Sequence, residues 1–147
     1  MKPHPHFRDR EIPRIHALGI FRLKALSVDD LVRDYCAVME SAADIKAANP
    51  SMTWPEGLTL EENLTDLAWH QTEFRNRRSF AWIIEDADGT YLGCLYVYPS
   101  ISGEDAADVH WWWRPGNGVH DDRFRDELSA WLSGRDWPPL DYRLQGK

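Results

Sequence analysis

Apolar and polar residues recur with two different periods along this chain, and the change of period separates helices from strands. Residues 19–26 alternate as a strand does. A helix with acidic residues in its first turn is expected over 28–41. A second helix is expected over 60–76, because Thr59 and Glu62 fit a capping box and the apolar positions that follow share one helical face.

Beyond residue 79 the apolar period is that of extended chain. Residues 80–85 and 91–98 are separated by a turn that contains Asp88-Gly89, which is typical of a hairpin. A third strand, rich in tryptophan, ends in residues 108–114. We therefore expect three neighbouring antiparallel strands, with the two preceding helices packed against them.

The last elements are a helix and a short strand. Residues 120–133 place four large apolar side chains on one helical face, and residues 140–144 read as a strand. Residues 1–18 show no sustained period and are predicted to be a tail or a strap over the surface. Residues 19–147 are predicted to form a single α+β domain, in which a mixed, largely antiparallel sheet is flanked by three helices.

Composition narrows the function classes. With 43% hydrophobic and 28% charged residues the chain falls in the globular class. A net charge of -7 argues against nucleic acid as a partner, because such binding needs a basic surface. There is no apolar run long enough to span a membrane and no signal core, so no membrane partner and a cytoplasmic location are expected. Cys36 and Cys94 are expected to be reduced, and no metal site is predicted.

The strand that ends at Arg114 passes into a glycine loop and then a helix. This arrangement presents backbone N–H groups to anionic cofactors. Together with the order of elements, the opening strand Phe21-Arg22-Leu23 and Gly93 inside a strand, it makes residues 19–144 resemble the GNAT superfamily of N-acetyltransferases. That resemblance implies a sheet that opens between its fourth and fifth strands and holds acetyl-CoA there. It also implies direct transfer of the acetyl group to an amine.

The resemblance implies which residues meet the cofactor and which do the chemistry. The cofactor-binding candidates come from the fourth strand and the loop after it: Val109, Trp111, Gly116, Asn117, Gly118 and Val119. The catalytic candidates are His110 and Asp108, two residues apart on one face of the strand. His110 is preferred as the base because its ordinary pKa lies near 6.5.

Two departures from the family pattern leave the function open. The loop glycines fall at the second and fourth places after Arg114, where the family has the third and fifth. Pro115 lacks an N–H group, and Asp121 with Asp122 brings negative charge to the helix start, so acetyl-CoA is expected to bind weakly or not at all. The family's last helix and last two strands are expected to be missing after residue 144.

Three hypotheses follow from this pattern. The protein is an N-acetyltransferase for an unknown small-molecule amine, a non-catalytic acetyltransferase-like module that binds a ligand or a protein, or an oligomeric scaffold. A sheet that ends near Leu144 would leave an unpaired edge beside apolar surface. We therefore predict a homodimer, or else packing of the N-terminal tail against that region.

Overall fold

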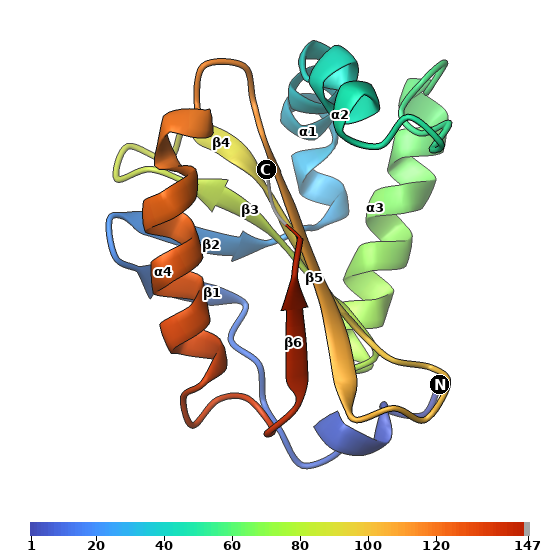
Figure 1. Cartoon of the computed structure of the whole chain (residues 1–147). Coiled ribbons are helices and arrows are strands. Elements are labelled where there is room, and N and C mark those ends of the chain that lie inside the picture. The colour runs from blue at the N-terminus through green and yellow to red at the C-terminus, as the bar shows by residue number, and fades with distance from the viewer. Residues whose placement is uncertain (146–147) are drawn as a thin grey trace.

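The computed structural model describes residues 1–145 and is built on a six-stranded sheet with helices on both faces (Figure 1). The strands are β1 (Ile15–Leu18), β2 (Phe21–Ala25), β3 (Phe80–Glu85), β4 (Tyr91–Pro99), β5 (Ala106–Trp113) and β6 (Asp141–Leu144). The helices are α1 (Leu31–Glu40), α2 (Ala42–Ala48), α3 (Leu60–Arg75) and α4 (Asp121–Leu132). The last two residues of the predicted domain lie outside the described part.

The capping box predicted for the second helix is present at the start of α3. The Thr59 hydroxyl accepts the Glu62 N–H at 3.1 Å, and the Glu62 carboxylate accepts the Thr59 N–H at 3.4 Å. Leu67 and Phe74 are buried on the face that packs against the sheet. Capping fixes where the helix begins, and the buried residues fix which face turns inward.

The hairpin and the three antiparallel strands are confirmed. Gly89 has a positive φ of 81°, and the Asp86 side chain accepts the N–H groups of Asp88 at 2.9 Å and Thr90 at 3.0 Å. β3 pairs antiparallel with β4, and β4 with β5. The turn residues and the β period therefore specify the centre of the sheet.

The strands lie side by side in chain order, and β6 is the one parallel neighbour, pairing with β5. The register joins Ala106 to Asp141 and Val109 to Leu144. β5 continues to Trp113, so its second half runs on beyond the part that β6 pairs with. The sheet therefore opens between β5 and β6, which are the predicted fourth and fifth strands once the additional β1 is counted.

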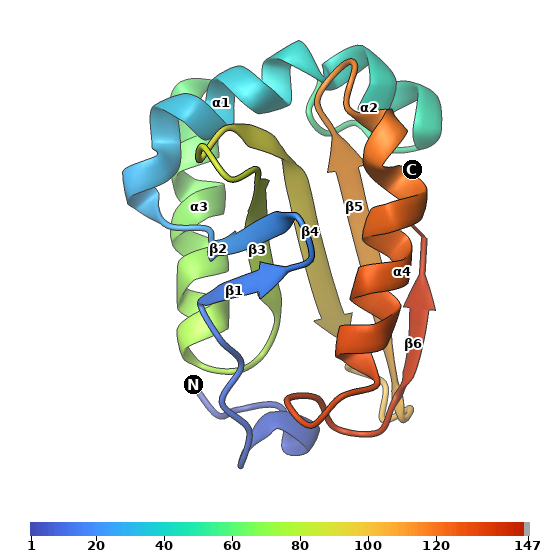
Figure 2. The ribbon, with the colours of Figure 1, turned by 90° about the vertical axis from the view of Figure 1, so that its left-hand side faces the viewer.

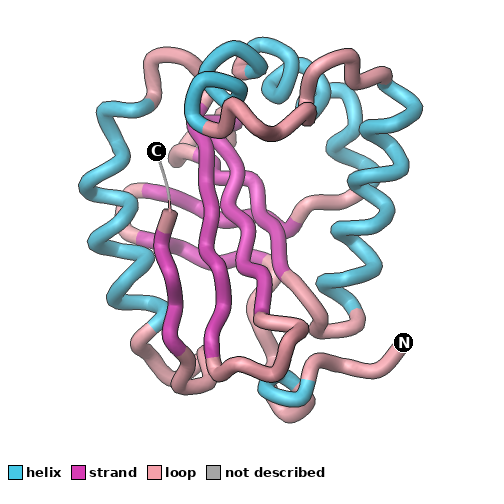
Figure 3. Tube along the Cα trace, turned by 45° about the vertical axis from the view of Figure 1, so that its right-hand side comes forward, coloured by secondary structure: helices cyan, strands magenta, loops and turns pink. Residues whose placement is uncertain are grey.

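Helices cover the two faces of the sheet unequally. α4 packs on one face, and α1, α2 and α3 lie on the other (Figures 2 and 3). Phe124 and Leu128 of α4 belong to a core with Trp82, whereas Val38 of α1 and Ile45 of α2 belong to a second core. No helix within residues 1–145 is long and apolar enough to cross a membrane.

Two elements were not expected. Residues 15–18 of the predicted tail form β1, which pairs with β2 through a turn at Gly19, where φ is 61°. The tail before it packs as a strap, with Phe7 fully buried and its ring centroid 5.0 Å from that of Phe80. A fourth helix, α2, follows α1 at once after Ser41. Ser41 is the N-cap residue of α2, but its hydroxyl donates to the Ala37 carbonyl at 2.7 Å and makes no cap hydrogen bond.

Candidate functional site

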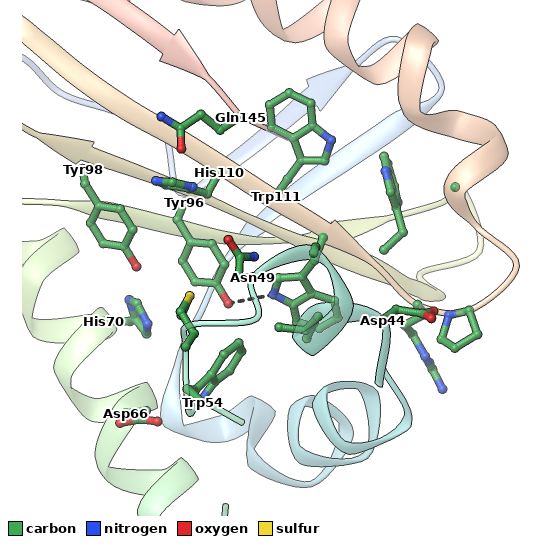
Figure 4. A pocket seen from close by; sticks show the side chains of 18 of the residues that line it. Asp44, Asn49, Trp54, Asp66, His70, Tyr96, Tyr98, His110, Trp111 and Gln145 are labelled. Carbon is green, nitrogen blue, oxygen red and sulfur yellow. Dashed lines mark hydrogen bonds between the residues drawn. The ribbon is translucent and has the colours of Figure 1, made fainter. Parts of the chain in front are cut away.

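A large cavity, of about 740 Å³, lies on the sheet face that carries α1 to α3 (Figure 4). Its lining residues come from α2 and the segment after it, from α3, from the neighbouring strands β4 and β5, and from the loop that leads to α4. It reaches Gln145, just beyond β6. The cavity thus begins where β5 and β6 separate and continues under the helices.

Aromatic side chains of two neighbouring strands form its floor. Tyr96 and Tyr98 of β4 stack with ring centroids 5.9 Å apart, and Tyr96 lies opposite His110 of β5 in the register. The Trp112 indole N–H donates to the Tyr96 hydroxyl at 3.1 Å. Alternate residues of a strand share a face, and this places all four side chains together.

One face of α3 forms a wall of the cavity with Asp66, Trp69 and His70. The His70 ring centroid lies 5.4 Å from that of Tyr96, and burial lowers the pKa of His70 to about 4. His70 is therefore neutral at pH 7. The sequence analysis missed these residues, although the i, i+4 spacing of Asp66 and His70 was a signal that they share a helical face.

The backbone of β5 is open on one side at this place. The Gln145 N–H donates to the Val109 carbonyl at 2.8 Å, so residue 109 directs its backbone groups toward β6. Alternation along the strand directs the N–H and C=O groups of Trp111 and Trp113 to the same side, beyond the last paired residue of β6. These groups are the first that a bound molecule between the strands can use.

The side chains of the same two tryptophans converge on Asp121 at the start of α4. Asp121 accepts the indole N–H of Trp111 at 2.7 Å and that of Trp113 at 2.9 Å. The guanidinium of Arg125 lies 4.7 Å from the Trp111 ring centroid and 3.9 Å from the Asp121 carboxylate. The carboxylate is therefore held against the strand by two indole donors, a role that the sequence analysis did not foresee.

The loop before α4 contains two glycines, so few side chains cover its backbone groups. Gly116 has a φ of 84°, and a Cβ there or at Gly118 would meet nothing within 4 Å. The Asn117 N–H closes a turn onto the Arg114 carbonyl at 3.0 Å. The Arg114 guanidinium is bound to the Glu40 carboxylate of α1. The loop consequently exposes glycine backbone while its one arginine is engaged elsewhere.

Solved structures of acetyltransferases match this fold. RimL, a ribosomal L7/L12 α-N-protein acetyltransferase in complex with coenzyme A, is 17% identical over 80% of this chain and 67% of that chain, with a TM-score of 0.64. The microcin C7 self-immunity acetyltransferase MccE, in complex with acetyl-CoA and AMP, is 12% identical over 78% of this chain and 63% of that chain, with a TM-score of 0.62. A GNAT-family acetyltransferase from Bordetella pertussis is 13% identical over 84% of this chain and 75% of that chain, with a TM-score of 0.59.

The chain has the GNAT acetyltransferase fold. Neither a comparison with protein-family models nor one with curated proteins finds a match. The predicted resemblance is thus confirmed at the level of the fold, by structure and not by sequence.

Within this GNAT fold the two catalytic candidates lie in different cavities. His110 lines the large cavity, whereas Asp108 lines a second one of about 430 Å³ and faces Arg143 in the register of β5 and β6. Burial lowers the pKa of His110, and the charge of Asp108 opposes that shift. A neutral imidazole that faces the cavity can accept a proton at neutral pH.

The cofactor candidates are spread around the open edge of β5. Trp111, Gly116 and Gly118 line the large cavity. Val109 is fully buried and its carbonyl is used by Gln145, and Val119 is 81% exposed outside the lining of that cavity. The Asn117 side chain donates to the Arg114 and Pro115 carbonyls at 3.3 Å. Within residues 1–145, no group of three His, Cys, Asp or Glu side chains is placed to hold a metal ion.

Proposed function

We propose that this protein is an N-acetyltransferase that uses acetyl-CoA and acts on a small-molecule amine. The observation that carries the proposal is the opening between β5 and β6, where the unpaired backbone of Trp111 borders the 740 Å³ cavity. An extended arm that enters a sheet at such a place finds N–H and C=O partners ready. Two of the similar structures hold coenzyme A or acetyl-CoA, which supports this choice of cofactor.

The residues around the opening fit the acyl-pantetheine arm better than the pyrophosphate. The backbone of Trp111 and Trp113 offers hydrogen bonds along the arm, and Gly116 and Gly118 leave room for a phosphate group to approach the loop. Asp122, in the first turn of α4, keeps a negative charge near that loop. Acetyl-CoA is therefore expected to bind, with an affinity weaker than micromolar.

When bound, acetyl-CoA supplies a thioester whose carbonyl carbon is attacked by the amine nitrogen while the carbon–sulfur bond breaks. His110 is the base in this proposal and takes the proton from the attacking amine. The backbone N–H of Trp111 would donate to the carbonyl oxygen of the thioester and so stabilise the negative charge that develops there. The products are the amide and the free thiol, and the proton held by His110 balances the proton that the thiolate takes up.

The test combines binding with turnover. Calorimetric titration with acetyl-CoA measures the affinity, and release of free thiol in the presence of a panel of amines measures transfer. We expect weak binding together with amine-dependent thiol release. Absence of both would refute the proposal.

One observation favours a second function, that of a non-catalytic GNAT-like module. The side chain of Arg114, which begins the loop, is bound to Glu40 and also donates to the Tyr91 carbonyl at 3.3 Å, so it is turned away from a ligand on the loop. A module of this kind would bind a ligand in the large cavity without releasing thiol. The titration and the turnover assay therefore separate the two functions.

Two further statements belong to the same proposal. A cytoplasmic location is consistent with two unpaired cysteines, Cys36 exposed and Cys94 buried. A homodimer is proposed because the outer side of β6 carries unpaired backbone groups.

A further inference from the structure

The far end of the large cavity, away from the opening between β5 and β6, combines a carboxylate with aromatic rings. Asp66 of α3 and Trp54 of the preceding segment lie there, opposite Trp111 and Gln145 (Figure 4). Trp69, three residues after Asp66 on α3 and so on the same side of that helix, also lines the cavity. We call Trp54, Asp66 and Trp69 the far subsite.

Asp66 and Trp54 line the same end of the cavity, and the Asp66 carboxylate is partly withdrawn from solvent. Burial raises the pKa of Asp66, the charge of Glu62 raises it further, and the Trp54 side chain opposes both effects. A carboxylate has two acceptor oxygens and an indole has a single N–H donor, so the carboxylate keeps acceptor capacity for a ligand.

The charges around this end are negative. Burial raises the pKa of Tyr98, and the nearby carboxylates of Asp66 and Glu73 raise it further. Of the described residues that line the cavity, Arg114 carries the one permanent positive charge, and it is bound to Glu40. A ligand that brings a positive charge would therefore be stabilised here, and an anion would be repelled.

Aromatic faces and a carboxylate together select one ligand chemistry. Indole rings attract ammonium groups through their negative faces, and a carboxylate of low exposure strengthens the attraction. The tyrosine and tryptophan surfaces between the far subsite and His110 suit an apolar stem. A carboxylate at one end and a proton acceptor at the other thus match a molecule with two amino groups.

We infer that the far subsite binds the ammonium group of an alkyl diamine, and that the second amino group of the same molecule extends toward His110. As a binding site the far subsite stands on its own geometry. As an acceptor site it rests on the proposed acetyltransferase activity, in which the second amine attacks the thioester and leaves as the amide.

Binding is tested first, on the full chain without acetyl-CoA. The probes are 1,4-diaminobutane, its neutral counterpart 1,4-butanediol and its anionic counterpart succinate, titrated by calorimetry. Of these three probes, we expect only 1,4-diaminobutane to bind. Asp66→Asn keeps the size of the side chain and one acceptor oxygen but removes the charge, so it should weaken diamine binding about tenfold.

The matched control is Asp126→Asn, which removes one exposed carboxylate of α4 outside the cavity. It should bind the diamine as the unaltered protein does. Circular dichroism of each variant shows whether it folds. Equal affinity of the unaltered protein for diamine and diol, or unchanged affinity in a folded Asp66→Asn variant, would overturn the inference.

Turnover is tested separately, so that the two proposals can fail separately. With acetyl-CoA and 1,4-diaminobutane, Asp66→Asn should raise KM with a smaller effect on kcat, because the subsite holds the part of the substrate that does not react. Diamine binding without thiol release would refute the acetyltransferase and leave the subsite standing. Thiol release with other amines but no diamine binding would refute the far subsite and leave the acetyltransferase proposal standing.

Discussion

A Cβ atom on Gly93 of β4 would lie 2.1 Å from the carbonyl oxygen of Trp112 on β5. A Cβ at residue 93 would therefore collide with the backbone of the neighbouring strand. Gly93→Ala should destabilise the fold by about 1–3 kcal/mol, because backbone atoms must move apart. Chemical denaturation measures the change. Gly118→Ala, where a Cβ meets nothing within 4 Å, should leave the stability nearly unchanged.

Replacing His110 tests the proposed base. His110→Gln should lower kcat about a hundredfold or more, the usual scale for loss of general base catalysis. Because burial lowers the pKa of His110, the unaltered enzyme should lose activity as the pH falls through a value below 6.5 and keep it above. His6→Gln, on the N-terminal strap outside the large cavity, should change neither. Full activity in His110→Gln would exclude this residue as the base.

The lowered pKa of His70 should make the stability of the fold depend on pH. Its pKa falls from 6.5 to about 4 on folding, so the unfolded chain binds the proton more readily. Its contribution to stability is complete above pH 6.5 and is lost as the pH falls from 6.5 to 4, by up to about 3 kcal/mol. Denaturation curves of the unaltered protein and of His70→Gln should therefore differ in their pH dependence within this window. Parallel curves would contradict the prediction.

Removing the charge of Asp122 should strengthen cofactor binding. Asp122→Asn should tighten binding of acetyl-CoA by about 0.3–1 kcal/mol, because it removes a negative charge at the start of α4. Asp121→Asn should not give this gain, since the Asp121 carboxylate holds the indoles of Trp111 and Trp113. Calorimetry on both variants, with Asp126→Asn as control, separates the two. Equal tightening in both would contradict the role of Asp121.

The edge of β6 predicts association. The strap already covers part of this region, because Phe7 packs on Trp137 with centroids 6.0 Å apart and Trp137 packs on Tyr142 at 5.9 Å. The outer backbone groups of β6 remain for a second copy of the chain. Sedimentation over a range of concentrations should show a homodimer. A monomer throughout that range would leave the strap as the sole cover of the apolar surface.

Much of the fold follows from local pattern. The capping box at Thr59, the Asp88-Gly89 turn and the alternation of β3 to β5 each act over a few residues, and all three are confirmed. β1 was missed because its four residues gain their order from pairing with β2. α2 was missed because it follows α1 without a side-chain cap hydrogen bond of its own.

The candidate site was foreseen on β5 and the loop after it. His110 and Trp111 were chosen from β5 and Gly116 and Gly118 from the loop, and all four line the large cavity. His70 and Asp66 were not chosen, because nothing in their own segment indicates that α3 packs over Tyr96. Asp108 was chosen for its place beside His110 on the same face of β5, but it lies further along the strand, opposite Arg143, where it lines the smaller cavity.

The sequence by itself determined the elements other than β1 and α2, together with their order and the hairpin, because caps, turns and apolar periods are properties of neighbouring residues. The tertiary structure alone decided that β6 pairs with β5 only as far as Val109, and that Asp121 accepts hydrogen bonds from two indoles. It also decided that Asp66 and Trp54 lie at the same end of the cavity. These relationships join residues from different elements. They depend on strand register and helix packing, which the whole folded chain sets and no local segment encodes.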